Sequence, residues 1–336
     1  MTGPGTSAFD HVDRMSDDRG LFEHAEGPTR REEHGYCVDD NARLLVVTSR
    51  ERDHGSPHRL SRLALEFVLA AQSTDGRFRN RMDRHGRWTD NFGTDDCWGR
   101  GIWGLGTAAA HHGDPAIRKR ALAGFDKGVR QRSTWRRAMA FAALGAAEVL
   151  TDDVDHAPAR ALLVDAIAVI GPLPPGSWRW PEPRLAYANA ALAEALIAAG
   201  AALANSAALD RGLTMLTWLL ELETPDGHLS TTGVGGRGPG DCGPMFDQQP
   251  IEAAAMADAC WRAYTVTGDR TWWHGVEVAA DWFNGDNDTA LPMYDDVSGG
   301  GFDGLHPEGV NVNQGAESTL ALISTTQRAR SFAPSP

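Results

Sequence analysis

The chain contains 336 residues, of which 32 are basic and 45 are acidic, giving a formal net charge of −13. A charge of this sign disfavours nucleic acid and anionic membrane surfaces as partners, because both would repel the protein. The length is sufficient for two average domains or for one large repetitive domain with a substantial core.

The N-terminus and the cysteines indicate the compartment. The first residues show no basic stretch followed by an apolar one, and no apolar run reaches the length of a membrane span. Four cysteines, Cys37, Cys97, Cys242 and Cys260, lack CxxC spacing and paired histidines, so the pattern indicates neither a zinc site nor a disulfide framework. We therefore expect a soluble cytoplasmic protein without a metal ion or another cofactor.

Apolar residues recur at intervals of three and four, as amphipathic helices require. The segments form two alternating sets. The first set is apolar or small nearly all round and comprises residues 39–52, 95–111, 133–149, 183–200, 248–266 and 313–330. The second set carries charged faces and comprises residues 6–16, 57–72, 114–130, 157–171, 205–222 and 269–283. Helices that are apolar on every side must be buried, so the sequence predicts six inner and six outer helices.

This alternation predicts an all-α fold, a closed (α/α)6 toroid that forms one domain over residues 1–336. An open superhelix of helix pairs is the alternative, but no repeat has the polar outer face of a capping repeat. Helix start signals agree with the predicted boundaries, since Pro57, Pro115 and Pro250 fall at first helical positions.

The connections between helix pairs carry a shorter repeat, a turn glycine close to an aromatic residue or leucine. It begins at Gly20, Gly76, Gly176, Gly227 and Gly301. A turn glycine before a short extended run predicts a small hairpin at one end of each helix pair. The connection of residues 128–133 is too short for this repeat, so we expect the ring to be low and open there.

Two further connections are long. Residues 230–246 are rich in glycine, and residues 284–312 are polar. Loops of this length in a compact domain are usually functional or disordered. We expect residues 230–246 to form a mobile rim or lid rather than packed structure.

Acidic residues stand at the start of several predicted inner helices. The segment from His34 to Arg43 brings Asp39 and Asp40 to the first of these helices. Comparable acids further along the chain are Asp95, Asp96, Asp247, Glu252 and Glu317. The N-termini of inner helices converge around one depression in a closed ring, so these carboxylates could reach a single ligand.

Most of these acids also have a structural explanation. Aspartate is a favoured N-cap, which suits Asp39 and Asp95, and a glutamate at the third helical position can complete a capping box, which suits Glu252. Asp40 and Asp96 lie just inside their helices, where the helix dipole favours an anion. We interpret Asp39 as the cap and Asp40 as the working carboxylate.

Aromatic and planar polar residues accompany these acids. The candidate ligand-binding residues are Tyr36, Asn41, Arg43, Asp95, Asp96, Trp98, Trp178, Trp180, Arg184, Gln248, Gln249, Asn313 and Gln314. Sugars need this mixture, because their apolar faces stack on aromatic rings and their hydroxyls bond to planar polar groups. A single aromatic residue can equally belong to the core, but Trp178 and Trp180 lie beside a proline-rich turn and are the strongest candidates for sugar platforms.

Hydrolysis of a glycosidic bond needs one carboxylic acid and one carboxylate. We predict Glu252 as the acid and Asp40 as the base. A helix N-terminus lowers the pKa of a carboxyl group, which hinders an acid, so burial and nearby acids such as Asp247 must overcome this effect. The distance between the two groups, which decides between inversion and retention, stays open.

The motif His-Gly-Tyr-Cys-x-Asp-Asp-Asn-Ala-Arg, from His34 to Arg43, resembles that of a family of sugar-active (α/α)-barrel proteins. The segments Gln248 to Glu252 and Asn313 to Glu317 extend the resemblance over nearly the whole chain. Within this family, the chain is similar to the hydrolases of methylmannose polysaccharides, which are endo-acting α-1,4-mannosidases. The resemblance implies hydrolysis of an intracellular polysaccharide by Asp40 and Glu252 without a metal ion. Asp39 is the substitute if Asp40 does not point into the cleft.

Three alternatives stay open, as does the oligomeric state. A sugar epimerase of the same toroid class would need histidines on inner helices as proton-transfer groups, whereas His34, His85, His228 and His306 fall in predicted loops. A phosphorylase would need a cationic phosphate pocket. A non-catalytic glycan-binding module that serves a glycosyltransferase would keep the aromatic residues but release no product.

Overall fold

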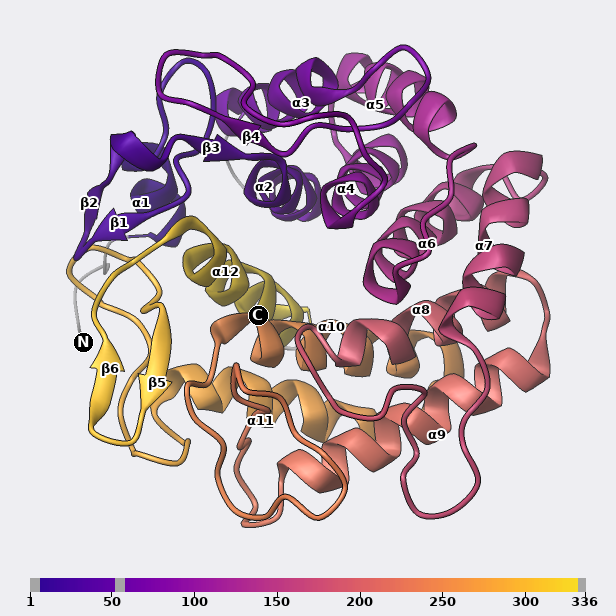
Figure 1. The fold of residues 1–336 in the computed structure, drawn as a ribbon, viewed down its shortest axis with the longest axis vertical. Helices are drawn as coiled ribbons and strands as arrows, with labels where there is room; N and C mark the ends of the chain where they lie inside the picture. The colour runs from indigo at the N-terminus through magenta and orange to yellow at the C-terminus, as the bar shows by residue number, and fades with distance from the viewer. Residues whose placement is uncertain (1–6, 52–57, 332–336) are drawn as a thin grey trace.

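The computed structural model describes residues 7–51 and 58–331, and these ranges contain twelve α-helices that alternate between an inner and an outer ring (Figure 1). The inner helices are α2 (Val38–Arg50), α4 (Asp96–His111), α6 (Arg136–Asp152), α8 (Ala190–Ala202), α10 (Pro250–Thr267) and α12 (Ala316–Arg330). The outer helices are α1 (Ala8–Arg14), α3 (His58–Ala71), α5 (Pro115–Gly128), α7 (Ala157–Ile170), α9 (Ser206–Glu223) and α11 (Trp272–Asn284).

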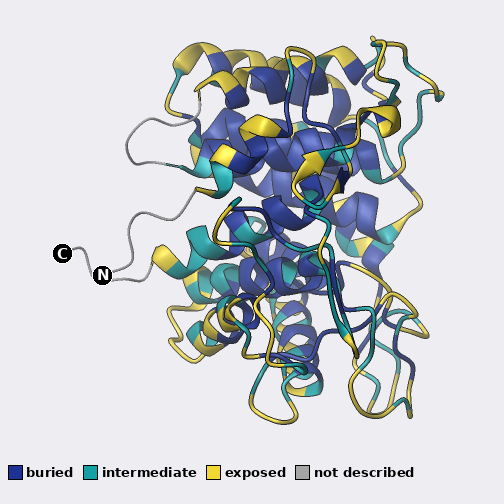
Figure 2. Ribbon diagram, turned by 90° about the vertical axis from the view of Figure 1, so that its left-hand side faces the viewer, coloured by how far each residue is buried: buried dark blue, intermediate teal, exposed yellow. Residues whose placement is uncertain are grey.

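The inner ring is closed. Each inner helix contacts the next one, and α12 contacts α2. Each outer helix packs on an inner helix, and α1 packs on α12, so the first helix of the chain covers the last. The inner helices are buried, whereas exposed residues gather on the outer helices and the loops (Figure 2). The predicted all-α (α/α)6 toroid is therefore confirmed.

Small residues bring the inner helices α4 and α6 close together. A Cβ atom added to Gly99 or Gly106 of α4 would overlap a backbone carbonyl oxygen of α6, and one added to Gly145 of α6 would overlap the carbonyl oxygen of Ile102. Glycine lowers helix propensity, so these glycines are explained by packing rather than by helix formation.

Replacement of Gly145 by alanine is expected to lower the free energy of unfolding by about 1–3 kcal/mol, because the helices must separate to admit the methyl group. The gain in helix propensity, about 1 kcal/mol, only partly offsets this loss. Thermal unfolding followed by circular dichroism measures the change. Gly113→Ala is the control, because no atom lies within 4 Å of the added Cβ position; equal midpoints for both variants would contradict the packing argument.

The two ends of the ring differ. The connections that leave the C-termini of α4, α6, α8 and α10 are short. At the opposite end lie longer connections and three antiparallel pairs of strands. These pairs are β1 (Ala25–Glu26) with β2 (Thr29–Arg30), β3 (Tyr36–Cys37) with β4 (Arg81–Met82), and β5 (Gly304–His306) with β6 (Gly309–Asn311). A 3₁₀ helix, Glu32–His34, precedes β3.

The connection before α6, residues 129–135, is the shortest of the six at this end, as the sequence predicts. Segments that begin at Gly20, Gly76 and Gly301 form isolated β-bridges near these glycines, which agrees with the predicted hairpins. Pro115 and Pro250 are first residues of helices, also as predicted. Pro57 lies outside the described residues.

Two sequence predictions are wrong. Helix α8 begins only at Ala190, and the stretch 183–189 that was expected to be helical is irregular, with Ala188 at a left-handed φ of 45°. Residues 230–246 are also packed in part, because Thr231 and Thr232 are buried and Gly233 forms a β-bridge with Gln248. Both differences are tertiary in origin, since contacts with α10 and its flanking loop replace the local preference.

Among the described residues, no helix combines the length and the apolar composition that crossing a bilayer requires.

Candidate active site

A cleft with a volume of about 670 Å³ opens at the N-terminal end of the inner helices. Its charged lining residues are Glu23, Asp39, Asp40, Arg43, Arg81, Asp96, Arg100, Glu252, Asp303 and Glu317. The carboxylates come from α2, α4, α10 and α12 and from the loops before them, as convergence of the inner helices predicts.

Asp40, the third residue of α2, is buried at the base of the cleft. Its carboxylate accepts hydrogen bonds from Cys37 Sγ at 3.1 Å and from Arg43 Nη1 at 2.6 Å. Burial raises the pKa of Asp40 to about 7; Arg43 opposes this shift and the negative charge of Glu317 adds to it. The group therefore titrates near neutral pH.

Asp39 lines the cleft but is not the N-cap, because that position is occupied by Cys37, so the predicted capping role is wrong. Asp39 Oδ2 accepts a hydrogen bond from Asn80 Nδ2 at 3.0 Å. Its buried Oδ1 lies 3.7 Å from Arg100 Nε and has no hydrogen-bond partner among the described residues. This oxygen of Asp39 is thus buried beside Arg100 without a hydrogen bond.

Glu252, the third residue of α10, is 4% exposed and makes no capping box. Its carboxylate instead accepts hydrogen bonds from the backbone N–H of Ala188, from the backbone N–H of Asn189 at 3.1 Å and from Asn189 Nδ2 at 3.1 Å. Burial and the charge of Glu223 raise its pKa to about 8 against these hydrogen bonds. The effect of the helix N-terminus, which would hinder an acid, is overcome by burial.

The left-handed conformation of Ala188 explains how two consecutive amides reach Glu252. Such a conformation costs a non-glycine residue about 1–3 kcal/mol, and surrounding contacts must maintain it. Arg137 of α6 supplies them: it donates to both carboxylate oxygens of Glu182 at 2.8 and 2.9 Å, to the carbonyl oxygen of Tyr187 and to Asn189 Oδ1 at 3.2 Å. Arg137 therefore fixes residues 182–189, whose amides bind the carboxylate of Glu252.

Every arginine that lines the cleft is paired with an acid. Arg43 pairs with Asp40 and Glu317, Arg81 with Glu23, and Arg100 with Asp39. The cleft thus has positive groups but no unpaired cationic pocket among the described residues.

The structure brings several of the predicted site residues together. Those that line the cleft are Asp39, Asp40, Arg43, Asp96, Gln249, Glu252 and Asn313. Asp96 accepts a hydrogen bond from the Tyr187 hydroxyl, and burial raises its pKa. Its neighbour Asp95 occupies the N-cap of α4 but is exposed, makes no capping bond with any described residue and does not line the cleft.

The predicted aromatic ligands lie outside the cleft, so that part of the prediction is wrong. Trp98 is fully buried and its indole donates to the carbonyl oxygen of Gly128 at 3.0 Å. Trp180 is also fully buried, and the half-buried Trp178 packs at 4.8 Å from Trp218 of α9. Tyr36 is buried and donates to Asp17. These rings contribute to the core rather than to a sugar platform.

Four predicted polar ligands have structural roles instead. Asn41 is buried and accepts the backbone N–H of Leu21 at 3.0 Å. Gln248 and Gln314 are buried; Gln248 accepts from the Trp282 indole at 3.1 Å, and Gln314 accepts from Ser298 Oγ at 2.6 Å. The exposed Arg184 donates to Asp241 at 3.0 Å, which ties residues 230–246 to the irregular stretch before α8.

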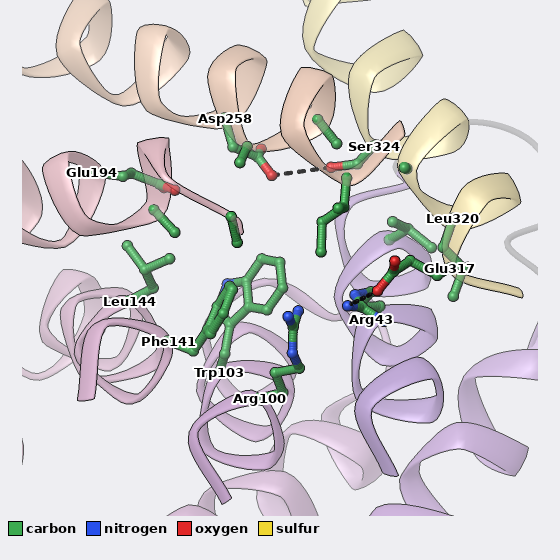
Figure 3. Close-up of a pocket in the computed structure, with 17 residues that line it drawn as sticks. Arg43, Arg100, Trp103, Phe141, Leu144, Glu194, Asp258, Glu317, Leu320 and Ser324 are labelled. Atoms are coloured by element: carbon green, nitrogen blue, oxygen red, sulfur yellow. Dashed lines mark hydrogen bonds and ion pairs between the residues drawn. The ribbon is translucent and has the colours of Figure 1, made fainter. Parts of the chain in front are cut away.

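Sequence reasoning missed three features of the site. Arg100 lies one helical turn after Asp96, a spacing that could have revealed it. Tyr187 lines the cleft and is 43% exposed, but it was hidden inside a predicted helix. Below the cleft lies a chamber of about 40 Å³, where the side chains of Trp103 and Phe141 lie against each other with Arg100 above Phe141 (Figure 3).

The ligand atoms of Glu23, Cys37 and Asp40 lie within 4.8 Å of one another, a separation that could hold a metal ion. Their chemistry does not fit one. Arg81 and Arg43 already pair with the two carboxylates, so a cation would have to displace two arginines to reach them.

The fold and the site define an (α/α)6 toroid with a carboxylate-rich cleft. No protein-family model and no curated protein matches the chain. Solved structures do match over nearly the full length. A sugar epimerase from a ruminal bacterium has a TM-score of 0.72 at 12% identity, with 98% of this chain and 97% of that chain covered.

Two further matches are another epimerase and a mannanase. Cellobiose 2-epimerase from Spirochaeta thermophila has a TM-score of 0.68 at 13% identity, with coverage of 97% and 96%. An inactive variant of an α-1,6-mannanase from Salegentibacter, in complex with α-1,6-mannotriose, has a TM-score of 0.63 at 13% identity, with 96% of each chain covered. At these identities the similarity establishes the fold.

Proposed function

We propose that the protein is a glycoside hydrolase that cleaves internal α-1,4-mannosidic bonds of a (methyl)mannose polysaccharide, with Glu252 as general acid and Asp40 as general base. The observation that carries the proposal is the presence of two buried carboxyl groups, with pKa values of about 7 and about 8, at one cleft. Hydrolysis of a glycosidic bond needs two such groups.

The lining of the cleft suits a neutral sugar. The amides of Gln249 and Asn313 and the exposed ring of Tyr187 offer planar polar groups and an apolar face. The paired arginines disfavour a phosphate co-substrate, so a phosphorylase is a poorer candidate. The mannanase from Salegentibacter is inactive when two adjacent aspartates are replaced, and this chain also places adjacent aspartates, Asp39 and Asp40, at its cleft.

We propose inversion at the anomeric carbon. Asp40 and Glu252 belong to α2 and α10, which flank α12 on opposite sides of it. Carboxyl groups about 6.5–9.5 Å apart leave room for a water molecule, whereas retention needs about 5–5.5 Å.

Sugar epimerisation is the second candidate, because two of the matched structures are named as sugar epimerases. An epimerase needs proton-transfer groups beside the reacting carbon, most often histidines. His24 is the only histidine among the described residues that line the cleft, and it belongs to a loop rather than an inner helix.

Incubation with manno- and gluco-oligosaccharides, methylated and plain, separates the two candidates. A hydrolase releases new reducing ends, and inversion of an α-linked substrate gives the β-anomer first in an NMR time course. An epimerase converts one sugar into another without a new reducing end. Failure to cut any oligosaccharide between pH 5 and 8 would refute the proposed hydrolysis.

The dependence of kcat/KM on pH should be bell-shaped with its maximum between about pH 7 and pH 8. Asp40 must be ionised to act as a base, so activity falls as the pH decreases below its pKa of about 7. Glu252 must be protonated to act as an acid, so activity falls as the pH increases above its pKa of about 8. Initial rates at low substrate concentration measure the profile, and a maximum near pH 5 would contradict these assignments.

A further inference from the structure

The rim of the cleft is uneven. Connections of residues 72–95, 171–189, 224–249 and 285–315 stand around it, whereas residues 129–135 form a much shorter connection between α5 and α6 (Figure 1). An enzyme that cuts inside a polymer must let the chain continue beyond the reacting bond. The low rim before α6 is therefore the natural place for one end of a bound chain to leave the cleft.

Two exposed aromatic residues lie on this connection and on the next one around the ring, residues 171–189. Trp135 is the last residue of the short connection and is 63% exposed, and Tyr187 lines the cleft and is 43% exposed. They are the only aromatic residues among the large hydrophobic residues that are exposed in the described part of the chain. The indole N–H of Trp135 makes no hydrogen bond to any described residue, so it is available to a ligand.

Arg137 links the two positions. It lies two residues after Trp135, and its guanidinium packs at 5.0 Å over the Tyr187 ring while donating to the Tyr187 carbonyl oxygen. The Tyr187 hydroxyl is bound by Asp96 of α4. The ring of Tyr187 is thus held at its face and at its edge, beside the amides that hold Glu252.

We propose that Tyr187 and Trp135 form a glycan track, along which a sugar chain runs from the reacting bond at Glu252 across the low rim. Tyr187 stacks on a sugar close to the reacting bond, and Trp135 stacks on a sugar further out. Exposed rings of this kind bury apolar area only when a partner covers them, and a sugar face is such a partner. The track rests on the proposed function for the choice of sugar, but its binding does not require turnover.

The track is tested by the affinity of α-1,4-linked manno-oligosaccharides of two, four and six units, measured by calorimetry in the Asp40→Asn background. Affinity should increase with length. Trp135→Ala should weaken binding of the longest oligosaccharide about tenfold, which is the range of one aromatic contact, and leave the shortest unchanged. Tyr187→Ala should weaken all three, whereas Tyr187→Phe, which keeps the ring, should stay within about threefold of the background.

Trp273→Ala, on the outer helix α11, is the matched control for loss of a tryptophan and should leave all affinities unchanged. Thermal unfolding of each variant shows whether Tyr187→Ala acts through the fold. Equal effects of Trp135→Ala at all lengths, or none at the longest, would overturn the track. The unmodified protein could release no new reducing ends while the affinity still depends on length in the expected way. That result would support the track and refute hydrolysis, so failure of the track and failure of the proposed hydrolysis are distinguishable.

Discussion

Replacement of Glu252 by glutamine is expected to lower kcat by about a hundredfold to ten-thousandfold, the usual contribution of a general acid. Binding of oligosaccharides should persist, because the substitution keeps the volume of the side chain and the shape of the cleft. Initial rates of reducing-end release and calorimetric affinities measure the two effects. A protein that only binds glycans would show no turnover to lose, and a variant that keeps its turnover would remove Glu252 from the mechanism.

The hydrogen bonds of Glu252 also predict a cost in stability. Both carboxylate oxygens accept N–H groups from Ala188 and Asn189, so the amide nitrogen of a glutamine would face a donor. An unsatisfied buried donor costs about 1–3 kcal/mol, which thermal unfolding would detect. The rate must therefore be measured well below the unfolding midpoint of the variant.

Glu223 provides the matched control for a buried glutamate. It is buried and accepts hydrogen bonds from Thr232, but it does not line the cleft, and burial raises its pKa to about 7. Glu223→Gln should keep most of kcat near neutral pH. It should also move the alkaline limb of the pH profile to lower pH, because the charge of Glu223 helps to raise the pKa of Glu252.

Asp40→Asn is expected to reduce kcat by a factor similar to that of the Glu252 variant, about a hundredfold or more, because asparagine cannot accept a proton from water. Arg43 keeps Glu317 as an ionic partner, so the buried guanidinium is not left alone. The fold should therefore survive, which circular dichroism and thermal unfolding would verify.

Asp39→Asn is the comparison that decides between the two adjacent aspartates. Asp39 has an oxygen without a hydrogen-bond partner, whereas both oxygens of Asp40 are occupied by Cys37 and Arg43. If Asp40 is the base, Asp40→Asn lowers kcat much more than Asp39→Asn does. For Asp39→Asn we expect kcat to fall about tenfold, as for the loss of one ligand contact. The reverse order would assign the base to Asp39, with Asp40 as the group that orients Arg43.

The arrangement of the site was partly predictable. Asp40 and Glu252 lie far apart in the chain, yet both were expected at one cleft because inner-helix N-termini converge in a closed ring. The short connection before α6, expected at residues 128–133, was likewise found, at residues 129–135. By contrast, Trp98, Trp178 and Trp180 were expected as ligands and proved to be core residues, because a tryptophan near a turn suits either place and only packing distinguishes them.

The sequence alone was sufficient to predict the ring. Six apolar helices alternate with six amphipathic ones, and no repeat has the polar outer face that an open superhelix would need at its ends. This periodicity is a local property of the chain. Tertiary structure decided the chemistry. The pKa of Glu252 depends on its burial, on Glu223 and on amides supplied by the irregular stretch 183–189. That stretch is bound in turn by Arg137 and by Glu252. These groups meet only in the folded ring, so no local pattern could have revealed them.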